Sequence, residues 1–148
     1  MMDIGKIGKV ASVAKTTEQK SAKAFKLGQQ SYQQKQAQLD QLKTFKQEYE
    51  DKLGVMGQQG IAARQLQDYR LFLSKLNHAI NQQSEDVETS HQNLDSLKTQ
   101  WRSESQRKTA LDHLVDQEHQ KEVQARDKAE QKESDESVLA RMLVRDSS

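Results

Sequence analysis

Residues 53–73, LGVMGQQGIAARQLQDYRLFL, decide how the chain folds. Three of the six glycines, Gly54, Gly57 and Gly60, lie in this stretch, and the chain contains no proline. Glycine adopts a positive φ at little cost, so a helix can end there and the chain can reverse. We predict a glycine turn at about residues 54–60. Because a short connection between long helices makes them neighbours, the flanking helices should be antiparallel.

The sequence before the turn places apolar residues at heptad spacing. The first row is Ile4, Ala11, Phe25, Tyr32, Leu39 and Leu53, and the second is Ile7, Ala14, Leu42, Tyr49 and Met56. Polar or small residues interrupt these rows at Glu18, Ser21, Gly28, Lys35 and Lys46. The pattern predicts a helix over about residues 4–56 with a coiled-coil seam along one side.

A cleaner pair of rows follows the turn. The first row is Leu66, Leu73, Ile80, Val87, Leu94, Trp101 and Val115, and the second is Tyr69, Leu76, Leu97 and Leu111. Lys108 interrupts the first row, and Gln83, Ser90 and Glu104 interrupt the second. No segment alternates with the period of two that is typical of a strand. These rows predict a second helix over about residues 61–143.

The two helices differ in length, which predicts a C-terminal overhang. A first helix of this length would run roughly 75–80 Å, so its antiparallel partner should end near position 113. The second seam does stop at Leu111 and Val115, and a charged stretch follows. We therefore predict one all-α domain over residues 1–148, a long antiparallel two-helix coiled-coil hairpin with a helical overhang. The acidic residues of this overhang would begin next to the basic N-terminal stretch of the chain.

The composition agrees with this interpretation. Of 148 residues only 33% are hydrophobic and 30% are charged, and the mean hydropathy is −1.02. That is too little apolar material for a globular core, whereas two long helices need only a narrow seam. No apolar run approaches the roughly 20 residues that span a bilayer, so we expect a soluble protein.

No pattern typical of catalysis is present. The chain lacks cysteine and a glycine-rich GKS/T loop, and its four histidines, His78, His91, His113 and His119, form no HExxH motif. The net charge of +1 disfavours nucleic-acid binding. We expect no enzymatic activity, cofactor, metal or nucleic-acid partner.

Two groups of apolar residues are not explained by the seams. Phe72 and Phe45 should lie at similar heights beside the seam, where they either broaden it or form an exposed patch for a partner. Val138, Leu139, Met142 and Leu143 form a stripe near the C-terminus, which is either a frayed tail or a docking helix. The basic N-terminal stretch could alternatively lie on an acidic membrane surface.

Several segments resemble flagellar FliJ proteins. They are LKTFKQEYEDKL (42–53), GVMGQQGIAARQLQDYRLFLSKLNHAINQQ (54–83), and Trp101 followed by RKTALDHLVDQ (107–117). The resemblance covers about residues 25–140. Its most specific positions are Tyr49, Gly60, Ile61, Tyr69, Phe72, Leu76, Ala79, Ile80 and Gln83.

The resemblance implies a cytoplasmic component of the flagellar type III export apparatus, needed for motility. FliJ-like proteins are antiparallel two-helix coiled coils that resemble the γ stalk of rotary ATPases. The expected partners are the hexameric export ATPase, whose ring assembly they promote, the membrane export gate, and export chaperones. We expect a monomer, not inserted into the membrane but associated peripherally with the inner membrane at the flagellar basal body.

The resemblance, with the stripes described above, also implies contact residues. We expect the export gate to contact Gln38, Leu42, Phe45, Tyr49, Phe72, Leu76, Ala79 and Gln83. The ATPase would bind the end with the free termini, including Val138, Leu139, Met142 and Leu143. The alternative function is a generic structural coiled coil, in which the two seams pair between chains as a homodimeric scaffold.

Overall fold

The computed structural model describes residues 3–146 and consists of two α-helices. They are α1 (Ile4–Gln59) and α2 (Ala63–Asp146), and the described residues contain no strand. The two helices pack against each other, so the predicted all-α hairpin is confirmed. Both helices continue a little beyond the predicted ends, as expected for a chain rich in Gln, Lys, Glu, Ala and Leu, which lose little free energy on entering a helix.

The first helix begins at a side-chain cap. The Gly5 amide donates a hydrogen bond to Asp3 Oδ1 at 3.1 Å, and the Ile7 amide donates to the Asp3 carbonyl oxygen at 3.0 Å. An aspartate in this position satisfies backbone donors that have no partner inside the helix. Asp3 therefore defines where α1 starts.

The turn is narrower than predicted. It comprises Gly60 to Ala62, and only Gly60 has a positive φ, of 88°. The prediction that the turn starts at Gly54 is wrong, because Gly54 and Gly57 are helical residues of α1. A single glycine weakens a helix by only about 1 kcal/mol, which neighbouring residues with good helix propensity can offset.

Replacing glycine with alanine should have opposite effects on stability at two positions, Gly60 in the turn and Gly57 in α1. Gly60→Ala should destabilise the protein by about 1–2 kcal/mol, because a side chain disfavours that positive φ. Gly57→Ala should instead stabilise it by up to about 1 kcal/mol, because alanine is the better helix former. Neither new methyl group would meet an atom within 4 Å, so no steric clash confuses the comparison. Urea unfolding of both variants checks this, and equal effects would contradict the assigned turn.

Contacts divide the chain into two compact units, and each helix contributes to both. The hairpin unit is Lys20–Arg102, and the terminal unit combines Met1–Gln19 with Ser103–Ser148. The assignment of the whole chain to a single domain stays a prediction.

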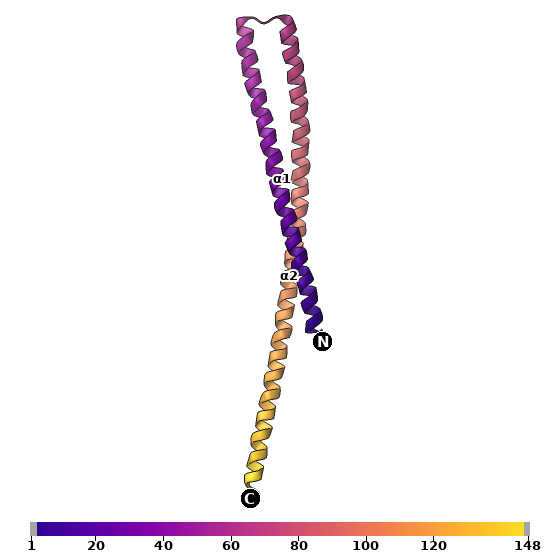
Figure 1. The fold of residues 1–148 in the computed structure, drawn as a ribbon, viewed down its shortest axis with the longest axis vertical. Coiled ribbons are helices and arrows are strands. Elements are labelled where there is room, and N and C mark those ends of the chain that lie inside the picture. The colour runs from indigo at the N-terminus through magenta and orange to yellow at the C-terminus, as the bar shows by residue number, and fades with distance from the viewer. Residues whose placement is uncertain (1–2, 147–148) are drawn as a thin grey trace. The chain divides into compact units, whose positions relative to one another are not determined.

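In the hairpin unit the two helices run antiparallel and are joined by the turn (Figure 1). Every predicted seam position of this unit is buried or partly buried, including the polar ones. Leu39 and Leu76 are each 7% exposed, and Ser21 and Ser90 are buried between the helices. The heptad register read from the sequence is therefore confirmed.

Large and small side chains alternate along this seam. Phe25 stacks on Trp101 with ring centroids 5.7 Å apart and planes within 5° of parallel. One helical turn further on, a Cβ atom added at Gly28 would lie 2.7 Å from Leu97 Cδ1. Glycine at this position lets the α1 backbone approach Leu97 closely.

In the terminal unit the start of α1 packs on α2. Ile7 and Ala14 are 4% exposed and Ala11 is 8% exposed. The partly buried residues of α2 in this unit include Glu104, Lys108, Leu111, Val115 and Glu118, which follow the same heptad spacing.

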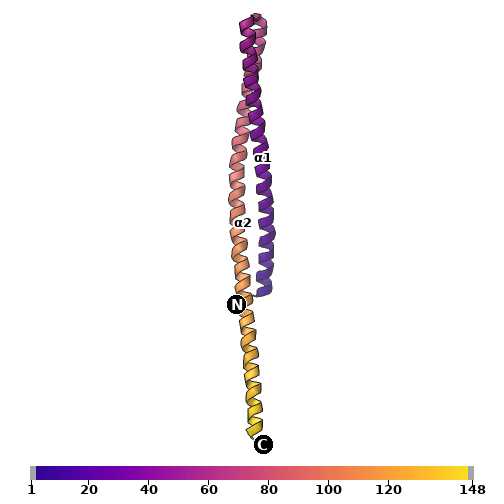
Figure 2. The same ribbon diagram turned by 90° about the vertical axis from the view of Figure 1, so that its left-hand side faces the viewer.

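The overhang is visible within the terminal unit. Val123 is the last partly buried residue, and every residue from Gln124 to Asp146 is exposed. Two views at right angles show this part of α2 with no helix beside it (Figures 1 and 2). The predicted C-terminal overhang is confirmed. Neither described helix is apolar enough over a sufficient length to cross a bilayer.

Candidate functional site

Four aromatic rings gather in the hairpin unit, close to the turn. This aromatic cluster consists of Phe45 and Tyr49 from α1 with Tyr69 and Phe72 from α2. The Phe72 ring lies 4.6 Å from that of Tyr49 and 6.1 Å from that of Phe45, and the Tyr49 and Tyr69 rings are 5.4 Å apart. Tilted and edge-to-face rings at these distances attract one another beyond their hydrophobic contact. The cluster therefore joins the two helices near the turn.

The outer rings of the cluster remain open to solvent. Phe45 is 47% exposed and Phe72 is 39% exposed, although they contact each other. The sequence offered a broadened seam and an exposed patch as alternatives for these two residues. The structure combines them, because the contact widens the seam while the outer ring faces stay uncovered.

The apolar surface lies on one flank of the hairpin unit. Each of the four residues Gln38, Phe45, Phe72 and Ala79 immediately precedes a first-row seam position. Such positions face each other in an antiparallel pair, as the Phe45–Phe72 contact shows. The opposite flank carries Lys43, Glu50, Arg70 and Asn77 at the corresponding heights. A partner with an apolar surface would therefore approach from one side only.

The rings of the aromatic cluster carry no charge, although charged residues such as Asp68 and Lys75 lie one helical turn from Phe72. Burial raises the pKa of the Tyr49 hydroxyl, and the neighbouring Tyr69 and Asp68 act in the same direction. The tyrosine therefore stays neutral at physiological pH, and the cluster offers rings without a phenolate charge. The nearby ammonium group of Lys46 lies 3.8 Å from a Glu50 carboxylate oxygen, within the same helix.

The other predicted gate residues occupy different environments. Leu76 is buried, Leu42 and Ala79 are partly buried, and Gln38 is exposed. Gln83 Nε2 donates hydrogen bonds across the seam to the Lys35 carbonyl oxygen at 3.0 Å and to Gln38 Oε1 at 3.3 Å. Leu76 and Gln83 thus hold the helices together, whereas the aromatic cluster and Gln38 provide the exposed surface.

The comparisons with known proteins identify the family. The family described as Flagellar FliJ protein matches residues 3–147 of the chain. The chain belongs to the FliJ family. Comparisons with curated proteins and with solved structures found no match. Like other FliJ family members, the chain is a component related to flagellar protein export.

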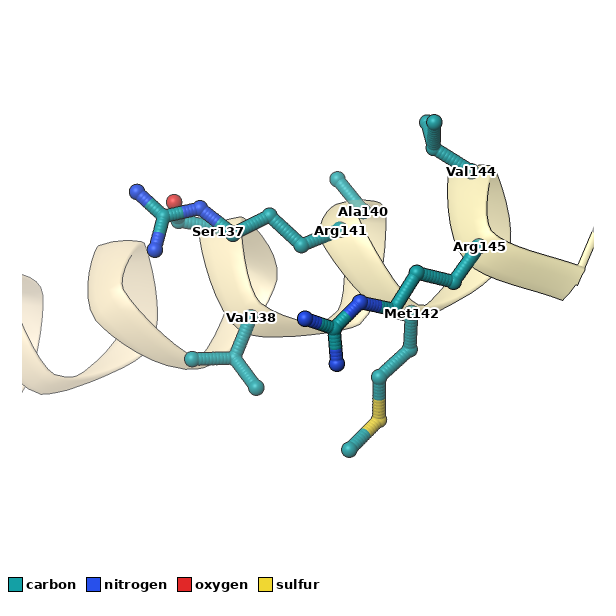
Figure 3. Close-up of a pocket in the computed structure, with 7 residues that line it drawn as sticks. All are labelled: Ser137, Val138, Ala140, Arg141, Met142, Val144 and Arg145. Carbon is teal, nitrogen blue, oxygen red and sulfur yellow. The ribbon is translucent and has the colours of Figure 1, made fainter.

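The C-terminal stripe of this FliJ family member lies on the overhang. Val138, Leu139, Met142 and Leu143 are between 49% and 64% exposed. In Figure 3 the side chains of Val138 and Met142 extend from the same side of the helix, and the Arg145 guanidinium lies near them. Because one helical stretch forms this surface alone, it has no opposing wall that would enclose a small molecule. A docking partner would have to supply that wall.

The described residues also bear on the metal prediction. Between residues 3 and 146, no three or more His, Asp or Glu side chains come together in a way that could hold a metal ion. His91 Nδ1 lies 3.6 Å from a carboxylate oxygen of Asp95, and its ring contacts the edge of Tyr32. Neither contact assembles a catalytic arrangement.

Sequence reasoning missed two features of the site. Tyr69 was assigned to the seam and to the FliJ resemblance but not to the gate contact, yet its ring belongs to the aromatic cluster. Gln83 was treated as an interruption of the seam and as a contact of the export gate, and its hydrogen bond between the helices was not predicted. The spacing of Tyr69 and Phe72, one helical turn apart, was the signal that could have placed both rings together.

Proposed function

We propose that the chain is a two-helix stalk of the flagellar export apparatus. It binds the membrane export gate through the hairpin unit and the hexameric export ATPase through the terminal unit, where it promotes ring assembly. It also escorts export chaperones. Membership of the FliJ family supports the general role, and the presence of exposed apolar side chains in both units supports two separate partners.

The exposed aromatic cluster is the observation that carries the gate contact. Large exposed apolar patches on soluble proteins usually mark interaction sites, and aromatic residues dominate the binding energy of many interfaces. Phe45 and Phe72 present their rings to solvent on the same side of the hairpin unit. The cytoplasmic region of the gate protein would cover these rings.

The overhang is the part available to the ATPase. From Gln124 to Asp146 all sides of α2 are uncovered, and Leu139 and Met142 are each 59% exposed. Most helical stability in proteins comes from tertiary packing, which this part of α2 lacks, so a partner that covers it would also stabilise it. The apolar stripe suits a surface formed by the ATPase.

The proposed mechanism requires no chemistry from this chain, and we propose that it is not an enzyme. A protein that binds two partners can couple them if it contacts the conformations of one partner unequally. The terminal unit would favour some ATPase conformations, while the hairpin unit holds the gate.

We further propose that the protein is a cytoplasmic monomer, held at the inner membrane through the gate. Both heptad rows of α1 and both of α2 are covered within one chain in the hairpin unit, which supports the monomer over the alternative homodimer. Sedimentation of a single-chain species would support the monomer, and a stable dimer would favour the scaffold alternative.

Truncation tests the assignment of the ATPase to the overhang. A variant that ends at Val123 should keep its thermal midpoint within about 3 °C, because the described residues that it lacks, Gln124 to Asp146, are all exposed. It should lose measurable binding to the export ATPase in a pull-down while still binding the cytoplasmic region of the gate.

A point variant provides the matched control for this truncation. Leu139→Ser combined with Met142→Ser should weaken ATPase binding, whereas Ala125→Ser combined with Ala129→Ser, also in the exposed overhang, should not. A truncated protein that binds the ATPase normally would refute this part of the proposal.

A further inference from the structure

A second exposed apolar surface lies on the paired part of the terminal unit. Val10 is 45% exposed and Val13 is 65% exposed, beside the buried residues Ile7, Ala11 and Ala14. The two valines are one helical turn apart, so they lie on one side of α1. They are separate in sequence from both the aromatic cluster and the C-terminal stripe, and no predicted site includes them.

The burial pattern assigns these valines to one flank of the terminal unit. Val10 immediately precedes the buried seam residue Ala11, as Phe45 precedes its own seam position. On α2 the equivalent position is Leu114, which precedes Val115 and is partly buried. Ala110, one turn earlier on α2, faces the same way as Val13 does on α1. We call this surface the valine flank: Val10, Val13, Ala110 and Leu114.

The charges of the two flanks of the terminal unit differ in sign. Positions on the same side as the valine flank carry Lys6, Arg107 and Lys121. Asp3 is the one acid at these positions, and its side chain caps the start of α1. The Lys121 ammonium group lies 3.4 Å from a carboxylate oxygen of Glu118 on the same helix, so Lys6 and Arg107 carry most of the positive charge. The opposite flank carries Asp112 and Asp116 with Lys15, and its one valine, Val123, lies at the end of the paired part of α2. The valine flank therefore combines most of the exposed apolar side chains of the paired part with an excess of positive charge.

We propose that the valine flank binds an acidic amphipathic α-helix of a partner protein. A helix whose apolar residues extend from the seam to one flanking position is typical of bundles, where a third helix covers the added face. Both helices of the terminal unit contribute such residues to the valine flank. The lysines and arginine at its edges would attract carboxylates of the incoming helix and fix its position.

The size of the surface fits a short helical segment. From Lys6 to Thr17 the flank spans eleven residue steps, roughly 17 Å, which is about three turns of a docked helix. This inference depends on the packing and charges of the terminal unit alone, and not on which export component binds the overhang.

A designed peptide pair tests the proposal with the full-length chain. The probe is a fluorescein-labelled helix of about three heptads with leucine at the seam positions and glutamate at the flanking ones, and its counterpart replaces glutamate by lysine. We expect the acidic peptide to bind at least about tenfold more tightly than the basic one in fluorescence anisotropy. Raising the salt concentration should weaken the acidic complex, because the edge charges are exposed to solvent.

Two substitutions at neighbouring positions distinguish a specific effect of the valine flank from a general effect of added negative charge. Val13→Asp should weaken binding of the acidic peptide at least about tenfold, whereas Ser12→Asp adds the same charge on the opposite flank and should change it less than about twofold. Both positions are exposed, and circular dichroism should show unchanged melting for each variant. Equal losses would overturn the proposal.

Two other occupants give distinguishable results. If vesicles with about one-third anionic lipid bind the wild type but not Val13→Asp, and the acidic peptide does not bind, the flank faces a membrane and the proposal is wrong. If sedimentation shows a dimer that the Val13→Asp substitution dissociates, the occupant is a second copy of the chain, and the proposal is also wrong. None of these results depends on Leu139 or Met142, so they leave the proposed ATPase contact untouched.

Discussion

Replacing Leu76 with alanine should destabilise the protein by about 2–3 kcal/mol, the largest stability effect that we expect from a single side chain. Leu76 is 7% exposed and lies in the seam of the hairpin unit, one turn from the aromatic cluster. Its removal takes away apolar contacts and leaves a gap between the helices. Solvent can reach such a gap in a two-helix structure, so the loss should fall at the low end of the range for buried leucines. Urea unfolding followed by circular dichroism measures it.

Leu71→Ala is the matched control for this prediction. Leu71 lies on the same helix, five residues before Leu76, and is 58% exposed. The same change there should alter the free energy of unfolding by less than about 0.5 kcal/mol. Comparable losses at the two leucines would show that the assigned register is wrong.

The register could be predicted from the sequence because it is set by local spacing. Lys35 and Lys46 were assigned to the seam only by counting in sevens, and both are partly buried there. A long side chain can lie along apolar neighbours while its ammonium group reaches water, so a lysine does not break the pattern. The same counting placed Ser21 and Ser90 between the helices, where both are buried.

The exact turn could not be predicted in the same way. Gly54, Gly57 and Gly60 are equivalent as candidates, since each can take a positive φ. Which one does so depends on the seam: Leu53 and Met56 still occupy seam positions and are partly buried, so α1 continues past Gly57. The reversal then falls at Gly60, the one described glycine with a positive φ.

The site was predicted in part. Equal distance from the turn placed Phe45 and Phe72 at similar heights, and their rings do meet. Their exposure could not be predicted, because it depends on how closely the helices approach and on which side each ring turns. The hydrogen bond from Gln83 to the Lys35 carbonyl oxygen could not be predicted either, because every residue has a backbone carbonyl and the sequence does not indicate which one accepts.

Phe72→Ala should reduce affinity for the cytoplasmic region of the export gate by about 30-fold or more, which is the effect of losing a central aromatic residue from an interface. The ring is partly exposed and is supported from behind by Tyr49 at 4.6 Å. Because those contacts also contribute to folding, we expect a modest loss of stability, about 1 kcal/mol. Calorimetry or surface plasmon resonance gives the affinity, and urea unfolding gives the stability. Leu27→Ala, at a 55% exposed position outside the cluster in the same unit, should leave both unchanged.

A double substitution decides whether the cluster acts as one binding surface. Phe45 and Phe72 contact each other, so removing one ring also loosens the other, and the two losses of binding free energy should not add. We expect the combined variant to lose less than the sum of the single variants, by about 0.5–1 kcal/mol. Additive losses would mean that the gate contacts the two rings independently. A Phe72→Ala variant that binds the gate normally would instead show that the cluster serves only to join the helices, since its remaining effect would be on unfolding alone.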